Sequence, residues 1–159
     1  MASPGKKSFL LRIDPDLWAE IERLAARLRG RLPEAQDAEA RIVALNEFLF
    51  ADLGYAGNAD HYYDPRNCYL NEVLDRRTGI PLTLSVLYME IGRRIGLPLE
   101  GVSFPGHFLV RLPLRGSLLV LDPFSAGEPQ SEADLRARLR RVIPEGATGP
   151  VPLEQLPLE

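Results

Sequence analysis

Two residues of the chain, His107 and Asp122, have the types and the spacing of a catalytic pair. Each lies at one end of a short segment in which apolar and polar residues alternate, at 107–112 and 117–122. This pattern predicts two strands of an antiparallel hairpin. Counting across a four-residue turn at 113–116 places His107 directly opposite Asp122, on the same face of the sheet. A carboxylate in that position orients an imidazole and fits it to act as a base.

The same pair also has a structural interpretation. Asp122 precedes Pro123 and Phe124, so its side chain could cap the turn that follows, with His107 only satisfying the carboxylate. A change of one residue in the turn would place the two side chains on opposite faces. Spacing alone leaves both interpretations open.

A His and Asp pair becomes an enzyme when a nucleophile lies within reach of the base. The thiol of Cys68 is one candidate, because we expect Asn67 to cap a helix there and a helix N-terminus stabilises a thiolate. A single cysteine is more often a small buried apolar residue. The hydroxyls of Thr83 and Ser85 are weaker candidates, since a hydroxyl needs stronger activation than a thiol.

No metal or cofactor is predicted. One cysteine and two histidines are too few for an ordinary zinc site, and His61 stands between turn-forming residues, although Asp60 and Asp64 are near it in the sequence. The chain contains no glycine-rich phosphate loop and no dinucleotide fingerprint. A cluster of arginines near the end of the chain is most simply a solvated helix face, and its members are Arg136, Arg138, Arg140 and Arg141.

The elements that would position these residues follow from the hydrophobic period. Helices are expected from a cap at Asp14 to Gly30, from about Asp37 to Gly54, from Asn67 to Thr78, from Pro81 to Ile95, and from Ser131 to Arg141. Residues 54–66 have no period and are expected to be an irregular connector. Strands are expected at 99–104, 107–112 and 117–122. Helices followed by an antiparallel sheet predict an α+β domain.

The composition of the chain limits its number of domains, its partners and its location. The chain has 159 residues, 45% of them apolar and 26% charged, which fits one globular domain, expected at 1–143, followed by a Pro-rich tail or linker at 144–159. A net charge of −3 gives no attraction to nucleic acid or anionic lipid. No apolar stretch is long enough for a membrane span or a signal sequence, so a cytoplasmic location is expected. The single cysteine cannot form an intramolecular disulfide.

The stretch Tyr62–Pro81 contains the pattern NxYLNEVLxRRxGIP, and PGHF and LDPF follow it. Over roughly residues 40–127 the chain resembles the SirB-type branch of the transglutaminase-like superfamily, a segment that is also similar to part of a eukaryotic F-box protein. The resemblance implies a papain-like arrangement, in which a helix with a cysteine at its start packs on an antiparallel sheet that supplies His and Asp. On this resemblance His107 and Asp122 match the last two members of the triad.

The first member of the triad does not match. Where the superfamily has its cysteine, this chain has Pro81, which has no nucleophilic atom, and Cys68 stands 13 residues earlier. The resemblance also implies a downstream region of tetratricopeptide-like repeats in bacterial members, so the chain resembles a fragment or a shortened form.

We therefore expect a non-catalytic domain that binds a peptide or a protein in a groove between the Pro81 helix and the sheet. The residues expected to line this groove are Pro81, Thr83, Asn67 and Tyr63. One alternative is a thiol-dependent amidase, protease or acyltransferase that uses Cys68 with His107 and Asp122. Another is a structural or regulatory domain that positions a repeat region.

Overall fold

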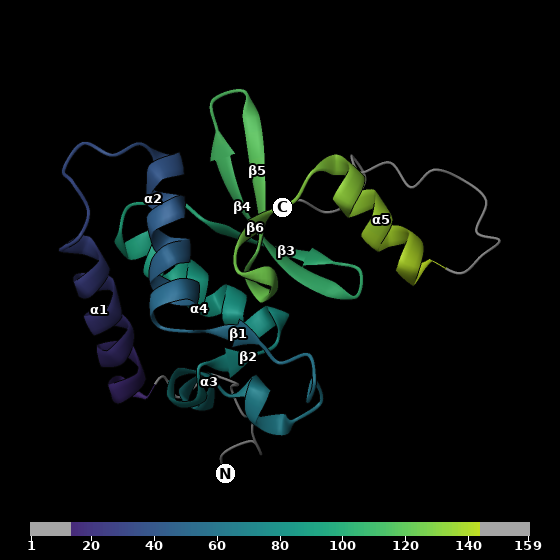
Figure 1. The fold of residues 1–159 in the computed structure, drawn as a ribbon, viewed down its shortest axis with the longest axis horizontal. Coiled ribbons are helices and arrows are strands. Elements are labelled where there is room, and N and C mark those ends of the chain that lie inside the picture. Colours follow the sequence, from purple (N-terminus) through teal and green to yellow (C-terminus); the bar gives the residue numbers. More distant parts are fainter. Residues whose placement is uncertain (1–13, 144–159) are drawn as a thin grey trace, which may run out of the picture.

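Most of the helices precede the four-stranded sheet in the chain, and one last helix, α5, follows it (Figure 1). The computed structural model describes residues 14–143, so the predicted Pro-rich tail at 144–159 lies outside the described residues. The α+β prediction is confirmed. The elements are α1 (Pro15–Arg29), α2 (Ala38–Asn46), η1 (Glu47–Asp52), β1 (Ala56–Gly57), η2 (Pro65–Cys68), α3 (Leu70–Arg76), β2 (Thr78–Gly79), α4 (Pro81–Arg94), β3 (Glu100–Phe104), β4 (His107–Leu114), β5 (Ser117–Asp122), η3 (Pro123–Ser125), β6 (Glu128–Pro129) and α5 (Glu132–Val142).

The first helix begins at its predicted cap, and the second begins near its predicted start with a cap that was not predicted. The carboxylate of Asp14 accepts a hydrogen bond from the backbone N–H of Asp16, and that of Asp37 accepts one from Ala40. Each bond satisfies a donor that the first turn of a helix leaves free. The buried face of α1 is the one that the helical period predicts, and it consists of Ile21, Leu24, Ala25 and Leu28.

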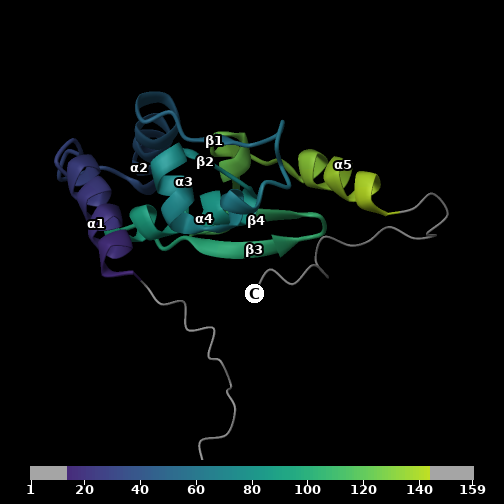
Figure 2. The same cartoon turned by 90° about the horizontal axis from the view of Figure 1, so that it is seen from below.

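Helix α4 lies at the centre of the main core. It packs on β3 and β4, and α1 and α2 pack against it from the other side (Figures 1 and 2). Its buried side chains include Leu84, Leu87, Tyr88 and Ile91. The Tyr88 hydroxyl donates to Asn46 Oδ1 at 2.8 Å, which fixes α4 to the end of α2.

The four-stranded antiparallel sheet has the order β3-β4-β5-β6. The three longer strands fall where the sequence predicts them, while the two-residue β6 was not predicted. The connector at 54–66 is also less irregular than expected, because β1 in it pairs in parallel with β2. Strands of two residues carry no readable alternation, so the sequence could not indicate them.

The register between β4 and β5 differs from the prediction by two residues. Leu114 lies opposite Ser117, so the turn has two residues, not four. Gly116 occupies the turn with a φ of 73°, a conformation that glycine adopts without strain. A shift of two residues keeps every side chain on its predicted face, because side chains alternate with a period of two.

A second apolar cluster joins the sheet to the last helix. Leu139 of α5 packs there with residues of three strands, namely Val102, Phe104, Leu109 and Val120. Helix α5 begins at the predicted Ser131, whose hydroxyl and backbone N–H both bond to Asp134. The face of the sheet that carries Leu109 is therefore covered by α5, and the face that carries Val110 and Leu112 belongs to the core with α4.

Two glycines with the same backbone conformation give a test of this packing. Gly127 and Gly116 both have a φ of 73°, but a Cβ at Gly127 would lie 2.1 Å from Asn46 Oδ1, and one at Gly116 would meet nothing within 4 Å. We expect Gly116→Ala to cost about 1 kcal/mol from the positive φ alone. Gly127→Ala should cost roughly 1–3 kcal/mol more, because the Cβ displaces the Asn46 amide. Urea denaturation measures the loss of unfolding free energy in both variants. Equal losses would contradict the close approach of Gly127 to Asn46.

Candidate functional site

The structure brings the predicted pair together. His107 Nε2 lies 2.9 Å from Asp122 Oδ1 and is hydrogen-bonded to it. With the two-residue turn, His107 and Asp122 are diagonal rather than directly opposed neighbours, and they meet because both lie on the same face and diagonal side chains are within reach. Asp122 is fully buried, and 11% of the His107 side chain is exposed.

Asp122 has partners on three elements. In addition to His107 on β4, the backbone N–H of Phe124 in η3 donates to Oδ1 at 3.1 Å, and Arg138 Nη2 of α5 forms an ion pair with Oδ2. Burial by itself raises the pKa of the carboxyl. The hydrogen bond and charge of His107, together with the charge of Arg138, outweigh burial and hold the pKa of Asp122 below its ordinary value. The group is therefore an ionised carboxylate at neutral pH.

Arg138 was not predicted to belong to the site. The arginines of α5 were expected on a solvated face, but the Arg138 side chain is 25% exposed, and its Nε donates to Gln130 Oε1 at 3.0 Å. The spacing from Leu135 and Leu139 puts Arg138 at the edge of the apolar face of the helix, and that signal could have separated it from its neighbours. Arg140 and Arg141 are exposed, as predicted.

The prediction of a helix start at Cys68 is wrong. Cys68 ends the short helix η2, and α3 begins two residues later at Leu70 without a side-chain cap. The thiol is exposed, and no hydrogen bond joins it to His107 among the described residues. Cys68 therefore lacks the helix N-terminus that was expected to stabilise a thiolate.

Asn67 is a buried connector and not a cap. Its Nδ2 donates to the carbonyl oxygens of His61 at 2.9 Å and Tyr62 at 3.1 Å. Its own carbonyl accepts the Thr83 hydroxyl at 2.8 Å. These bonds tie the loop before η2 to the first turn of α4.

Pro81 is the first residue of α4, as predicted, and its side chain is buried. The neighbouring Thr83 hydroxyl accepts the backbone N–H of Ile80 at 3.1 Å, which completes the first turn. Because α4 packs directly on β3 and β4, the predicted groove is occupied by the side chains of the core. The hollow that borders His107 instead lies between η3 and α5, with a volume of about 490 Å³.

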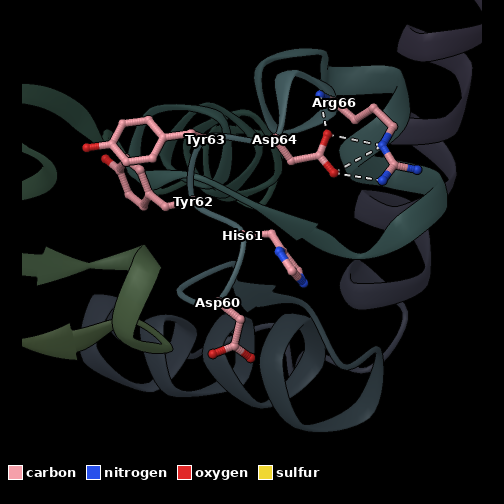
Figure 3. A pocket seen from close by; sticks show the side chains of 6 residues that line it. All are labelled: Asp60, His61, Tyr62, Tyr63, Asp64 and Arg66. Carbon is pink, nitrogen blue, oxygen red and sulfur yellow. Dashed lines mark hydrogen bonds and ion pairs between the residues drawn. The ribbon is translucent and has the colours of Figure 1, made fainter.

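An aromatic row leads from the pair to the surface. The rings of His107 and Phe124 are 6.0 Å apart, those of Phe124 and Tyr62 are 6.1 Å apart, and those of Tyr62 and Tyr63 are 5.3 Å apart. All three contacts are edge-to-face, a geometry that aromatic rings favour. Figure 3 shows the two tyrosine rings next to each other, and Tyr63 is 93% exposed.

The loop that carries these tyrosines also surrounds a polar hollow of about 440 Å³, lined by residues from Asp60 to Arg66 (Figure 3). Asp64 is paired with Arg66, whose hydrogen bonds hold the pKa of the carboxyl well below its usual range. Within residues 14–143, no group of three or more His, Cys, Asp and Glu side chains is arranged to hold a metal ion. Over the same residues, no helix has both the length and the apolar character of a membrane span.

In this chain a central helix, α4, packs on an antiparallel sheet that carries a His and Asp pair, as the transglutaminase-like resemblance implies, but the helix begins with Pro81. The model of the transglutaminase-like superfamily matches residues 16–152, and the chain belongs to this superfamily, in its SirB-type branch. The match extends beyond the predicted range of 40–127 at both ends. No solved structure gives a significant match.

The chain is similar to several proteins of known sequence. It is 48% identical over 131 residues to a UPF0162 protein of Xylella fastidiosa, which covers 79% of this chain and 47% of that protein. It is 38% identical over 125 residues to a UPF0162 protein of Vibrio cholerae, which covers 77% of this chain and 46% of the other. The human F-box only protein 21 is 50% identical over 68 residues, 43% of this chain and 11% of that protein. The chain thus spans about half the length of its bacterial relatives.

Acid should weaken the fold through Asp122. Its pKa is lower in the folded protein than the value of about 3.9 in an unfolded chain, so its stabilisation is present above about pH 4 and is lost as the pH falls through the folded pKa. Asp122→Asn should cost on the order of 2–4 kcal/mol at pH 7, since it leaves the partly buried Arg138 without its counter-charge. The difference from the wild type should shrink below pH 4 in urea denaturation. Glu128→Gln, an exposed carboxylate at the same hollow, should change stability little at any pH.

The labelling rate of Cys68 tests whether the thiol belongs to the site. Iodoacetamide should label Cys68 equally fast in the wild type and in His107→Gln, because no hydrogen bond couples the two side chains. The variant His61→Gln controls for loss of a histidine, and mass spectrometry of the intact protein gives the rates. A marked slowing in His107→Gln alone would show that the imidazole activates the thiol.

Proposed function

We propose that this domain is a non-catalytic binding module for a peptide or a protein. The observation that carries the proposal is the start of α4. Its first residue is Pro81, which has no nucleophilic atom, at the position where the superfamily resemblance puts the cysteine. The His107 and Asp122 pair is complete at 2.9 Å, and no thiol or hydroxyl of the described residues is hydrogen-bonded to the His107 ring.

The distribution of the Asp122 charge supports the same proposal. In a catalytic triad the carboxylate serves the histidine, stabilising the imidazolium that forms during the reaction. Here Arg138 also forms an ion pair with Asp122, so the carboxylate is shared between an imidazole and a guanidinium. We infer that the pair holds β4, β5 and α5 together and fixes the orientation of the imidazole next to the hollow.

The surface near the pair fits a peptide. Tyr63 is almost fully exposed, Tyr62 is 38% exposed, and Phe124 connects their rings to His107. Exposed tyrosines provide large contact area with few rotatable bonds, which is why aromatic residues are common at binding surfaces. In this proposal Asn67 and Thr83 do not contact the partner, and they position the tyrosine loop on α4 through their hydrogen bonds.

A defined peptide tests the proposal. Random short peptides displayed on phage are selected on the purified whole chain, and the dissociation constant of a selected peptide is measured by fluorescence anisotropy. Tyr63→Ser should weaken binding about fivefold or more, since an aromatic contact at an interface commonly contributes over about 1 kcal/mol. Val43→Ser removes an apolar side chain of α2 that is 56% exposed, and it should leave binding unchanged.

The same peptide separates binding from catalysis. Cys68→Ser should bind it as the wild type does, and mass spectrometry should recover the peptide intact after long incubation. Cleavage or acyl transfer that stops in Cys68→Ser would overturn the proposal in favour of a thiol enzyme. Failure to select any peptide that depends on Tyr63 would also contradict it.

A further inference from the structure

The hollow between η3 and α5 is lined by several side chains that carry nitrogen atoms able to form hydrogen bonds. Its volume is about 490 Å³, and His107, Phe124, Arg138 and Arg141 are among the residues that line it. Phe124 supplies an apolar wall that continues into the tyrosine row. The other side is the face of α5 that carries Ala137 and the two arginines.

Some nitrogen atoms of His107 and Arg138 are already hydrogen-bonded to other residues of the protein. His107 is hydrogen-bonded to Asp122 through Nε2, and its Nδ1 has no hydrogen bond to any of residues 14–143. Arg138 uses Nη2 for Asp122 and Nε for Gln130, and its Nη1 has no hydrogen bond to any described residue. The internal bonds fix the guanidinium of Arg138, so its Nη1 is preorganised to donate to a ligand.

Arg141 differs from the other basic side chains of its helix. Arg136 is paired with Glu132, whereas Arg141 lines the hollow and forms no ion pair with a described residue. It lies three residues after Arg138, one turn along the same face of α5. Two guanidinium groups therefore border the hollow from the same helix face.

Two acidic residues at the hollow limit the negative charge that a bound ligand can carry. Glu128 and Asp134 also line the hollow, and Asp134 is occupied by the backbone N–H and hydroxyl of Ser131. A dianionic phosphate would be repelled by both carboxylates. A single carboxylate carries less charge and matches the planar geometry of a guanidinium.

Building on the binding function proposed above, we propose that this hollow binds a carboxylate group of the peptide or protein partner, with Arg141 and Arg138 Nη1 as the main donors. The source of the carboxylate is either a free C-terminus or a glutamate or aspartate side chain. An apolar or aromatic residue next to it in the partner packs on Phe124 and Tyr62. Phe124 borders both regions, so one short peptide can contact the hollow and the tyrosine row together.

Three pools of random pentapeptides test the inference on the whole chain by NMR. The first pool ends in a free carboxylate, the second is amidated and contains one glutamate, and the third is amidated and neutral. We expect the first or the second pool to shift the backbone signals of α5, and the pool that does so identifies the source of the carboxylate. Arg141→Gln should weaken binding of the best peptide from that pool about tenfold, as expected for one charge-assisted hydrogen bond. Arg140→Gln, an exposed neighbour that does not line the hollow, should have no effect.

The remaining outcomes separate the two proposals. Equal binding of the neutral pool, or equal effects of Arg141→Gln and Arg140→Gln, overturns the carboxylate inference while the binding function stands. If no pool binds, the proposed function fails and the inference fails with it. Because both arginines are exposed, neither variant is expected to disturb folding, and circular dichroism verifies this.

Discussion

The fully buried carboxylate of Asp122 links the strands and helices in the second half of this protein to one another. Asp122 ends β5, and its two oxygens bond to β4 through His107, to η3 through a backbone N–H, and to α5 through Arg138. A buried charge is costly unless it is paired and hydrogen-bonded. These elements must therefore be in place together, and the position of α5 on the sheet depends on the same group that orients the histidine.

The first half of the protein is organised around α4 in a different way. There the contacts are mostly apolar, and polar bonds link the first turn and the middle of α4 to neighbouring segments. Thr83 binds the carbonyl of Asn67 at the start, and Tyr88 binds Asn46 further along. Asn46 in turn donates to the Gly127 carbonyl at 3.2 Å, in the turn between η3 and β6. The bond between Asn46 and Gly127 holds η3 against α2 as well as against the sheet. It therefore fixes Phe124 of η3 between His107 and the tyrosine loop.

Sequence periodicity predicted the longer elements well and the local chemistry less well. The caps at Asp14 and Ser131 were readable because a short polar side chain preceded an apolar helical pattern. The contact of His107 with Asp122 survived an error in the turn because the error was an even number of residues. The cap at Asn67 was wrong, since the same residue type that caps helices also bonds to loop carbonyls, and only tertiary contacts decide between the two.

The contact between Arg138 and Asp122 could not be predicted from the pattern of residues along the sequence. Helical spacing places it beside Leu139 but does not say which residue α5 meets, because that depends on how the helix packs across the sheet. In its observed position, Arg138 changes the electrostatic environment of the Asp122 carboxylate. A carboxylate that faces only a histidine prepares it to accept a proton, whereas one that also faces a guanidinium has less charge to offer the imidazolium. In the binding role proposed above, the carboxylate of Asp122 instead holds the side chains of His107 and Arg138 at the edge of the hollow.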